Sequence, residues 1–466
     1  MTRSSWLAAA VVIGSMATCP WGWAQCLAAD PPAAAANDSG NVNLSEVLKQ
    51  IGAGEGNIAE LLDDLDGVPV KTAAEAEQIC ALLKSLPHPK GDKVPTRPVL
   101  DALMPLFQQV ESAAAYDVLR STGTPELERL FHAFAGSRDP HTHESLMMAL
   151  KILAMYQTKQ GTQCVVDAAR KPFLPNNELW GVVLEQFDLK HPQAMEVIRQ
   201  LSTPLPPGMI GVALLDTANE LESEGNEFPH PLDTEAGVAR LESWLASKKP
   251  EEYSYAVSAA ATLPYLKRPE RETLVKLALK HPDPEVQIEG AFASAEITSS
   301  GDGVQRLAKW CADPRYARKA MRYLEELDQA KAIPATAKDP KFQATAEMCD
   351  WLADPNEYGQ PPDRIDLVDT RQLFWPPTGD KRAVWLFKYQ YDASEPNQQP
   401  ELGLGMVGSV TFALDGDNGP ERMPLEMYAL HCCWELQAAG DPRAPEQRSV
   451  EAGMKILTEK NPELVP

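Results

Sequence analysis

The chain has 466 residues, of which 44% are hydrophobic, so it is too long for a single core and is expected to form two or three domains. Its formal net charge of −23 argues against general binding to nucleic-acid phosphates or to an anionic membrane surface. An acidic surface also serves solubility, so the charge alone indicates no particular partner.

Residues 1–24 have the pattern of a signal peptide for export. Arg3 supplies a positive start, and Leu7–Ala17 forms a short apolar core. That core is too short to span a bilayer. Cys19 and Cys26 lack the preceding residues of a lipoprotein site, so lipid anchoring is the less favoured alternative. We therefore expect an exported protein that is periplasmic, part of the cell envelope or extracellular.

Residues 25–41 are rich in alanine and proline and are predicted to form a disordered tether. The following residues are predicted to be almost entirely helical, as an N-terminal segment over 42–100 and an array over 101–328. Thr72 and Glu75 form a capping box ahead of apolar residues at helical spacing. Further helices are predicted at 124–134, 141–156, 177–189, 193–201, 208–222, 235–247, 251–263 and 270–280.

The connections between these helices are short and usually contain proline. An aspartate side chain caps the free N–H groups at a helix start, and proline fits the first turn because its missing N–H costs nothing there. The dipeptides at these connections are Asp139-Pro140, His191-Pro192, Lys249-Pro250, Asp283-Pro284 and Asp313-Pro314. Helices joined this closely fold back as antiparallel neighbours.

The stretch HPDPEVQIEGAFASAEI, residues 281–297, is apolar around most of its helical circumference and rich in small residues. Such a helix is packed on more than one side, with neighbouring backbones close to it. Asp283, Val286, Ala291 and Ala295 resemble the second helix of a HEAT repeat, although Gln287 stands where these repeats often have arginine. The resemblance is strongest over 269–297 and 301–327. It implies an α-solenoid with protein-binding or scaffolding roles and brings no cofactor or catalytic residue; a non-repetitive helical bundle is the alternative.

The composition changes after Leu327. Residues 329–342 are predicted to be a linker, and residues 343–466 a small α+β domain. Arg382–Asp392 alternates aromatic residues on one face, Met406–Leu414 is a second strand-like run, and Arg364–Val368 is a possible third strand. Helices are expected at 344–352, 425–439 and 446–459. The predicted fold class is thus mainly α: a HEAT-like α-solenoid of antiparallel helix pairs followed by this domain.

Several motifs resemble chemical sites. His431, Cys432 and Cys433 would point in three directions from a helix. His431 and Cys432 lie on apolar stripes, where core packing is favoured over a thiol or metal cluster, whereas Cys433 is expected on the more solvated side of the helix. Gly403, Gly405 and Gly408 match the spacing of a dinucleotide-binding loop, but strand residues follow where that loop needs a helix.

Two weaker motifs are also interpreted as structural. Asp415–Glu426 resembles a calcium loop but has Pro420 at the position that requires glycine, so a polar turn is predicted. His141, His143 and Glu144 lie at an expected helix start, where the two histidines would diverge.

One basic surface stands out from the acidic background. Four cations recur at helical spacing, and two more lie on the preceding helix: Arg315, Arg318, Lys319, Arg322, and Arg306 with Lys309. We call these six residues the basic ridge. A solvated face neutralised by nearby carboxylates is one interpretation. The other is a docking site for an acidic partner or for the terminal domain.

These features favour an exported, non-enzymatic, protein-binding or scaffolding protein that needs no cofactor and binds no nucleic acid. The sequence contains no phosphate-binding loop, nucleophile elbow or zinc-protease motif. One alternative is an enzyme with a thiol or metal site in the terminal domain, using Cys433, His431 or a pocket near Trp375 and Trp385. A structural component of the cell envelope is the second alternative.

Overall fold

The computed structural model describes residues 43–188, 190–225, 229–298, 301–354, 357–375, 378–393, 399–414, 424–438 and 450–464. The predicted signal peptide and tether lie outside the described residues. The described chain divides into two compact units, one ending at Leu277 and the other beginning at Ala278.

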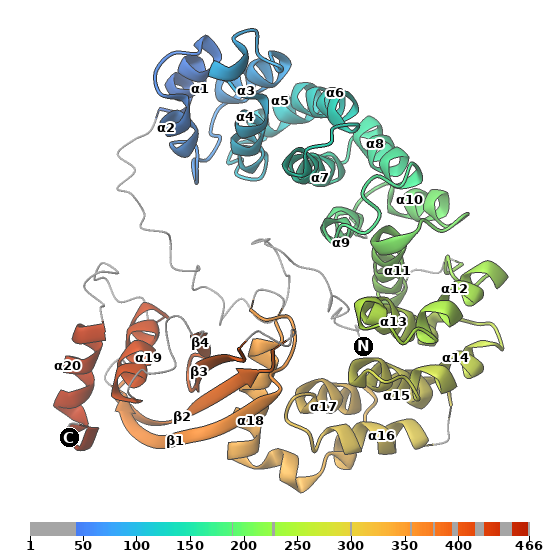
Figure 1. The fold of residues 1–466 in the computed structure, drawn as a ribbon, viewed down its shortest axis with the longest axis vertical. Coiled ribbons are helices and arrows are strands. Elements are labelled where there is room, and N and C mark those ends of the chain that lie inside the picture. The colour runs from blue at the N-terminus through green and yellow to red at the C-terminus, as the bar shows by residue number, and fades with distance from the viewer. Residues whose placement is uncertain are drawn as a thin grey trace. The chain divides into compact units, whose positions relative to one another are not determined.

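The first unit is helical (Figure 1). Its helices are α1 Leu44–Ala53, α2 Ile58–Asp63, α3 Ala73–Lys84, α4 Thr96–Leu103, α5 Ala113–Val118, α6 Thr124–Phe134, α7 Pro140–Met155, α8 Lys159–Arg170, α9 Leu179–Glu185, α10 Ala194–Leu201, α11 Gly208–Ser223, α12 Glu235–Leu245 and α13 Tyr253–Thr262; α14 Arg271–Ala278 ends at the boundary. The main contacts join helices no more than three positions apart along the chain. A continuous hydrophobic core connects residues from Leu44 to Leu221.

Side-chain caps explain where several helices begin. Thr72 accepts a hydrogen bond from the N–H of Glu75, whose side chain accepts one from the N–H of Thr72, which confirms the predicted capping box. Asp139 and Asp283 each cap the helix that follows by accepting hydrogen bonds from N–H groups of its first turn, where proline also lies. These caps satisfy N–H groups that the helix itself leaves unpaired.

The second unit combines helices with a sheet (Figure 1). Its elements are α15 Pro284–Ile297, α16 Asp302–Trp310, α17 Ala317–Glu326, α18 Pro340–Leu352, β1 Arg364–Trp375, β2 Asp380–Tyr391, β3 Glu401–Val407, β4 Phe412–Leu414, α19 Pro424–Ala438 and α20 Val450–Lys460. The unit therefore starts well before the predicted linker at 329–342. That segment forms two 3₁₀ turns, and its Ile333 and Ala337 are buried in the same core as α15–α17.

The close packing of α15 explains why residues 281–297 are so rich in small side chains. A Cβ atom on Gly303 of α16 would lie 2.4 Å from both the carbonyl oxygen of Ala291 and the nitrogen of Ala295. On Gly290, a Cβ atom would lie 2.7 Å from the Cβ of Ala278 and 3.2 Å from both the carbonyl carbon of Ala278 and the nitrogen of Leu279. Backbone thus meets backbone on two sides of α15, as the small residues predict.

The four strands form an antiparallel sheet in the order β1-β2-β3-β4. Phe387, Tyr389 and Tyr391 face α18 and share a core with it, with Trp385 packed against that core, so the predicted aromatic face is confirmed. Val384 and Leu386 face the opposite way and pack with α19 and α20. The sheet therefore lies between two layers of helix.

The strand boundaries differ from the prediction in two places. The predicted strand at 406–414 is divided into β3 and β4, because the chain turns at 408–411 where Gly408 packs against His431. β1 continues to Trp375, well past the predicted end at Val368, and a bulge interrupts its pairing with β2 between Leu367 and Asp369. No helix within the described part of the chain is both long and apolar enough to cross a membrane.

Candidate functional site

One residue of the basic ridge, Arg318, connects α17 to α18, the helix that covers one face of the sheet. Arg318 forms ion pairs with Glu347, at 3.4 Å, and with Asp350, at 3.2 Å, both on α18. Glu347 also accepts a 2.7 Å hydrogen bond from the hydroxyl of Thr411, just before β4. Arg318 thus takes part in a polar chain that runs from α17 through α18 to the sheet.

Lys319 lies in a mostly buried ionic network between α15 and α17. Its Nζ atom is 2.9 Å from a carboxylate oxygen of Glu285 and 2.9 Å from one of Glu289. Glu289 has a side chain only 3% exposed and accepts a 2.6 Å hydrogen bond from the hydroxyl of Tyr323. Burial opposes the charge of Lys319, but the two carboxylates raise its pKa well above the usual value. Lys319 in turn lowers the pKa of Glu285, so both members of this ion pair stay charged.

The other ridge residues have more local contacts. Arg306 pairs with Asp302 at 2.9 Å, and Arg315 with Asp313 at 2.7 Å. Arg322 lies over the ring of Tyr323, 5.8 Å from its centroid, and Lys309 is exposed. Four of the six cations thus form internal ion pairs, which reduces the charge that the ridge offers to an acidic partner. Docking of such a partner stays a prediction, whereas Arg318 does contact the helix that covers the sheet.

The His431 side chain is fully buried against the sheet. Its ring contacts Trp375 edge to face, with centroids 4.8 Å apart, and its Nε2 atom is 3.5 Å from the N–H of Val410. Burial lowers the pKa of His431 to about 4, so the ring is neutral at neutral pH. A neutral histidine enclosed by aromatic residues is a core residue.

The two neighbouring cysteines point elsewhere from α19. Cys432 packs in the core with the sheet. Cys433, expected on the more solvated side of its helix, is instead buried: a Cβ atom on Gly453 of α20 would lie only 2.7 Å from its Sγ atom. The packing of α20 buries Cys433, and the sequence of α19 alone does not predict that burial. Within the described ranges, no three histidine, cysteine or acidic side chains lie close enough to hold a metal ion.

Trp375 and Trp385 do not line a common pocket. Trp375 is fully buried in the core formed with α19 and α20, whereas Trp385 packs against the core on the α18 side of the sheet. Alternate residues of a strand face opposite sides, and the pairing of β1 with β2 places these two indoles on opposite faces.

The cysteines in the described residues should react slowly with alkylating reagents. All six are buried: Cys80, Cys164, Cys311, Cys349, Cys432 and Cys433. Burial raises the pKa of Cys349 to about 12 and that of Cys80 to about 11, so little thiolate is present at pH 8. We expect mass spectrometry of native protein treated with iodoacetamide to show each site modified far more slowly than after denaturation. Rapid modification of native Cys433 would contradict this and favour the thiol enzyme.

The glycines at 403, 405 and 408 make room for large side chains. A Cβ atom on Gly403 would lie 2.2 Å from the ring of Tyr389, and one on Gly405 would lie 2.3 Å from the sulfur of Met348. The first two glycines lie within β3, so no helix N-terminus follows them to bind a pyrophosphate. The packing of these side chains accounts for the positions of the glycines. In the calcium-like motif, residues 415–423 lie outside the described residues.

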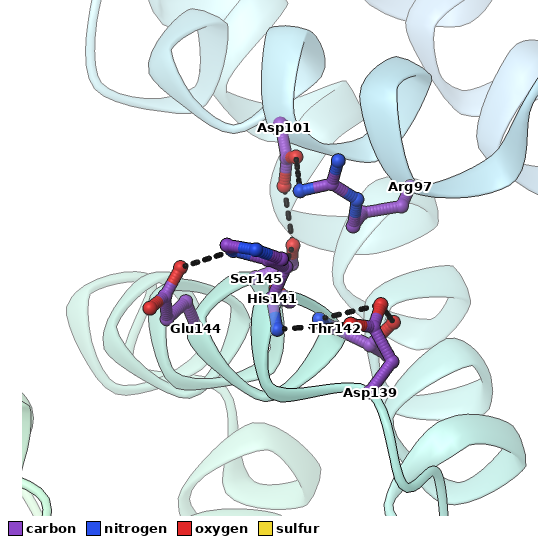
Figure 2. A network of polar contacts seen from close by, with 7 residues as sticks. All are labelled: Arg97, Asp101, Asp139, His141, Thr142, Glu144 and Ser145. Carbon is purple, nitrogen blue, oxygen red and sulfur yellow. Dashed lines mark hydrogen bonds and ion pairs between the residues drawn. The ribbon is translucent and has the colours of Figure 1, made fainter.

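His141 and His143 diverge at the start of α7, as predicted. The Nδ1 atom of His141 lies 3.4 Å from a carboxylate oxygen of Glu144, as Figure 2 shows. His143 turns the other way, with its Nε2 atom 2.7 Å from the carbonyl oxygen of Ser137 and its ring edge-to-face with Phe173. The two rings therefore do not converge on one ion.

The other side chains in Figure 2 attach α7 to α4 and cap its first turn. The hydroxyl of Ser145 donates a hydrogen bond to Asp101, which also pairs with Arg97 at 3.8 Å. Burial raises the pKa of Asp101, against the contacts with Ser145 and Arg97, which lower it. Asp139 accepts hydrogen bonds from the N–H and the hydroxyl of Thr142. Each polar group here has a structural role.

A polar groove of about 520 Å³ lies between α8 and α10. Its two guanidinium groups are already engaged. Arg170 donates to the carbonyl oxygens of Thr203 and Pro204 at 3.0 and 3.1 Å, and Arg199 pairs with Glu196 at 2.5 Å. The groove therefore offers an anion no uncommitted cation among its described lining residues.

Sequence reasoning missed the acidic partners of Lys319, which lie 34 and 30 positions away along the chain. It also did not identify the four histidines that precede proline as a group, although the repeated dipeptide is visible in the sequence.

In comparisons with known proteins, no family model and no curated protein matches the chain significantly.

Proposed function

We propose that this chain is an exported, non-enzymatic scaffold that binds other proteins along a HEAT-like array of helix pairs. The observation that carries the proposal is the order of the helix contacts. In the first unit each helix contacts mainly the helices next to it or within three positions along the chain. Stacking of this kind is typical of repeat proteins, whose extended surfaces suit protein partners.

The close packing of α15 supports the same proposal. Its small residues admit the backbone of α16 on one side and that of the turn after Ala278 on another. A helix wedged between successive neighbours is what the HEAT resemblance implies. Within the second unit, Arg318 and its two acidic partners link α17, the last helix of the proposed array, to α18, which covers the sheet.

The thiol and metal alternative draws less support from the geometry. His431, Cys432 and Cys433 face three directions, and each is buried by apolar or backbone neighbours. Catalytic thiols require an accessible thiolate, and a catalytic metal requires converging ligands. A scaffold needs neither.

The proposal predicts that a partner can be crosslinked from exposed positions on the array. Met195 and Tyr116 are 40% and 37% exposed, so a photoreactive amino acid fits at either position, and an aromatic one at 116 keeps the stacking on Tyr156. We expect irradiation of the protein in its native compartment to give the same covalent partner from both positions, identified by mass spectrometry. Val368, which is 51% exposed on β1, is the matched position outside the array and should not give that adduct. Absence of any common adduct from the two array positions would contradict a scaffold of this kind.

A further inference from the structure

Four buried histidines of this chain occupy the same kind of turn. Each is followed by proline, and in each the Nδ1 atom accepts a hydrogen bond from the backbone N–H of the second residue along. The pairs are His88 with Lys90 at 3.2 Å, His191 with Gln193 at 3.0 Å, His230 with Leu232 at 3.3 Å, and His281 with Asp283 at 3.1 Å. At most 9% of any of the four side chains is exposed. We call these the His-Pro turns.

Aspartate makes the same turn elsewhere in the chain. Asp139 and Asp283 also precede proline, and each accepts a hydrogen bond from the N–H two residues along, at 3.3 and 2.8 Å. The turn therefore needs a side-chain acceptor, and either an oxygen or an imidazole nitrogen supplies it. The two differ in one respect: a histidine ring loses its accepting nitrogen when it is protonated.

The surroundings of His230 show most clearly that its Nδ1 atom must accept a hydrogen bond and therefore carries no proton. The hydroxyl of Thr262 donates to the carbonyl oxygen of Ser258 at 2.8 Å, so its oxygen accepts from the amide nitrogen of Asn219 at 3.1 Å. The amide oxygen of Asn219 then faces the Nε2 atom of His230 at 2.9 Å. Nε2 must donate, which leaves Nδ1 as the acceptor for the N–H of Leu232. Both nitrogens of this neutral ring are thereby assigned.

Protonation of His230 would place two donors against each other. An N–H at Nδ1 would face the N–H of Leu232 in a site that is 3% exposed. The ring of Tyr265 stacks over His230, and Asn219, which Thr262 holds in place, contacts its Nε2 atom. Burial alone lowers the pKa of His230 to about 3.

The other His-Pro turns have some charged neighbours. Burial lowers the pKa of His191, while the carbonyl of Ala154 and the carboxylate of Asp188 oppose that effect. Asp283 lies beside His281, and its N–H donates to that ring. Beside His88, the Nε2 atom is 3.0 Å from the carbonyl oxygen of Gly52, and the Lys90 amino group donates to the carbonyl of Ala53.

We propose that the four His-Pro turns are acid-sensitive latches that hold helix connections closed at neutral pH and release them as the pH falls. The neutral ring closes the turn, and the protonated ring cannot. A histidine in an unfolded chain has a pKa near 6.5. At His191 and His230, whose pKa burial lowers, the latch is therefore at full strength above about pH 6.5 and weakens as the pH falls from there toward the pKa in the folded state.

Hydrogen–deuterium exchange of the wild-type protein tests the proposal. Peptides covering the N–H groups of residues 90, 193, 232 and 283 are compared at pH 7.5 and pH 5.0, after correction for intrinsic exchange rates. We expect the opening equilibrium at these positions to rise by up to about tenfold for each pH unit below 6.5, for one proton taken up on opening. The N–H of His141 is the internal reference, because its acceptor Asp139 has a lowered pKa and stays ionised over this range. Equal opening at both pH values would overturn the proposal.

Asparagine supplies a matched control at each position. Its side-chain oxygen can accept the same N–H in an Asx turn but does not titrate. The variants are His88→Asn, His191→Asn, His230→Asn and His281→Asn, made singly and together. We expect the acid-induced opening to disappear at each replaced turn. If it persists unchanged in folded variants, the latches are not the cause; if a variant does not fold, the wild-type comparison decides.

Discussion

Replacing Lys319 with methionine is expected to destabilise the protein by about 3–5 kcal/mol, because it leaves the buried carboxylate of Glu289 without the counter-charge that pairs with it. Glu289 is 3% exposed and lies 2.9 Å from Nζ, so it cannot recover its hydration when the cation is removed. Glu285 is 31% exposed and should be less affected. Urea denaturation, followed by exchange of peptides from α15 and α17, measures the loss.

Two further variants separate this charge effect from a loss of packing. Adding Glu285→Gln and Glu289→Gln to Lys319→Met should recover much of the stability, since glutamine removes the unpaired charges and can still accept the hydrogen bond from Tyr323. Arg306→Met removes an exposed pair with Asp302 and should cost no more than about 1 kcal/mol. A Lys319→Met variant that lost no more stability than Arg306→Met would show that the network contributes little.

Replacing Gly303 with alanine is expected to destabilise the packing of α16 on α15 by about 2–3 kcal/mol. The added Cβ atom would lie 2.4 Å from two backbone atoms of α15, which cannot move aside as a flexible side chain can. Alanine is itself a better helix former than glycine by about 1 kcal/mol, so a net loss would reflect the steric conflict. Denaturant unfolding measures the change.

Gly136→Ala is the matched control for this substitution. A Cβ atom on Gly136 would meet nothing within 4 Å, so its replacement should leave stability nearly unchanged. Gly290→Ala should resemble Gly303→Ala, because its Cβ would lie 2.7 Å from that of Ala278. Equal, small effects at all three positions would mean that α15 has room for larger neighbours and would weaken the argument for closely stacked helices.

The helices were largely predictable because their signals are local. Capping by Thr72, Asp139 and Asp283 depends on residues within one helical turn, and the apolar spacing marks the helix that follows. The small residues of α15 predicted close neighbours before any neighbour was known. The alternating aromatic residues of β2 likewise predicted a strand with one apolar face.

The charged and chemical features were harder to interpret. From its spacing, Lys319 belongs to the same helical face as Arg315 and Arg322, and only the packing of α15 against α17 shows that it is enclosed by Glu285 and Glu289. Cys433 is more buried than its helical face predicts, because α20, which is distant in the sequence, packs beside it. Ion pairs between separate helices, and the burial that one helix imposes on another, depend on how the helices pack. The spacing of residues within one helix does not give that information.

By itself, then, the sequence determined the helical character of residues 44–327, the start of α7 and α15, and the presence of a small sheet domain near the C-terminus. The tertiary structure decided where the two units divide, why β3 and β4 are separate strands, and that the cations at Arg318 and Lys319 are paired within the chain. The physical reason is the distance along the chain over which each kind of interaction acts. Caps, proline turns and apolar periodicity act within a few residues, whereas the burial of a charge or thiol depends on which distant backbone packs against it.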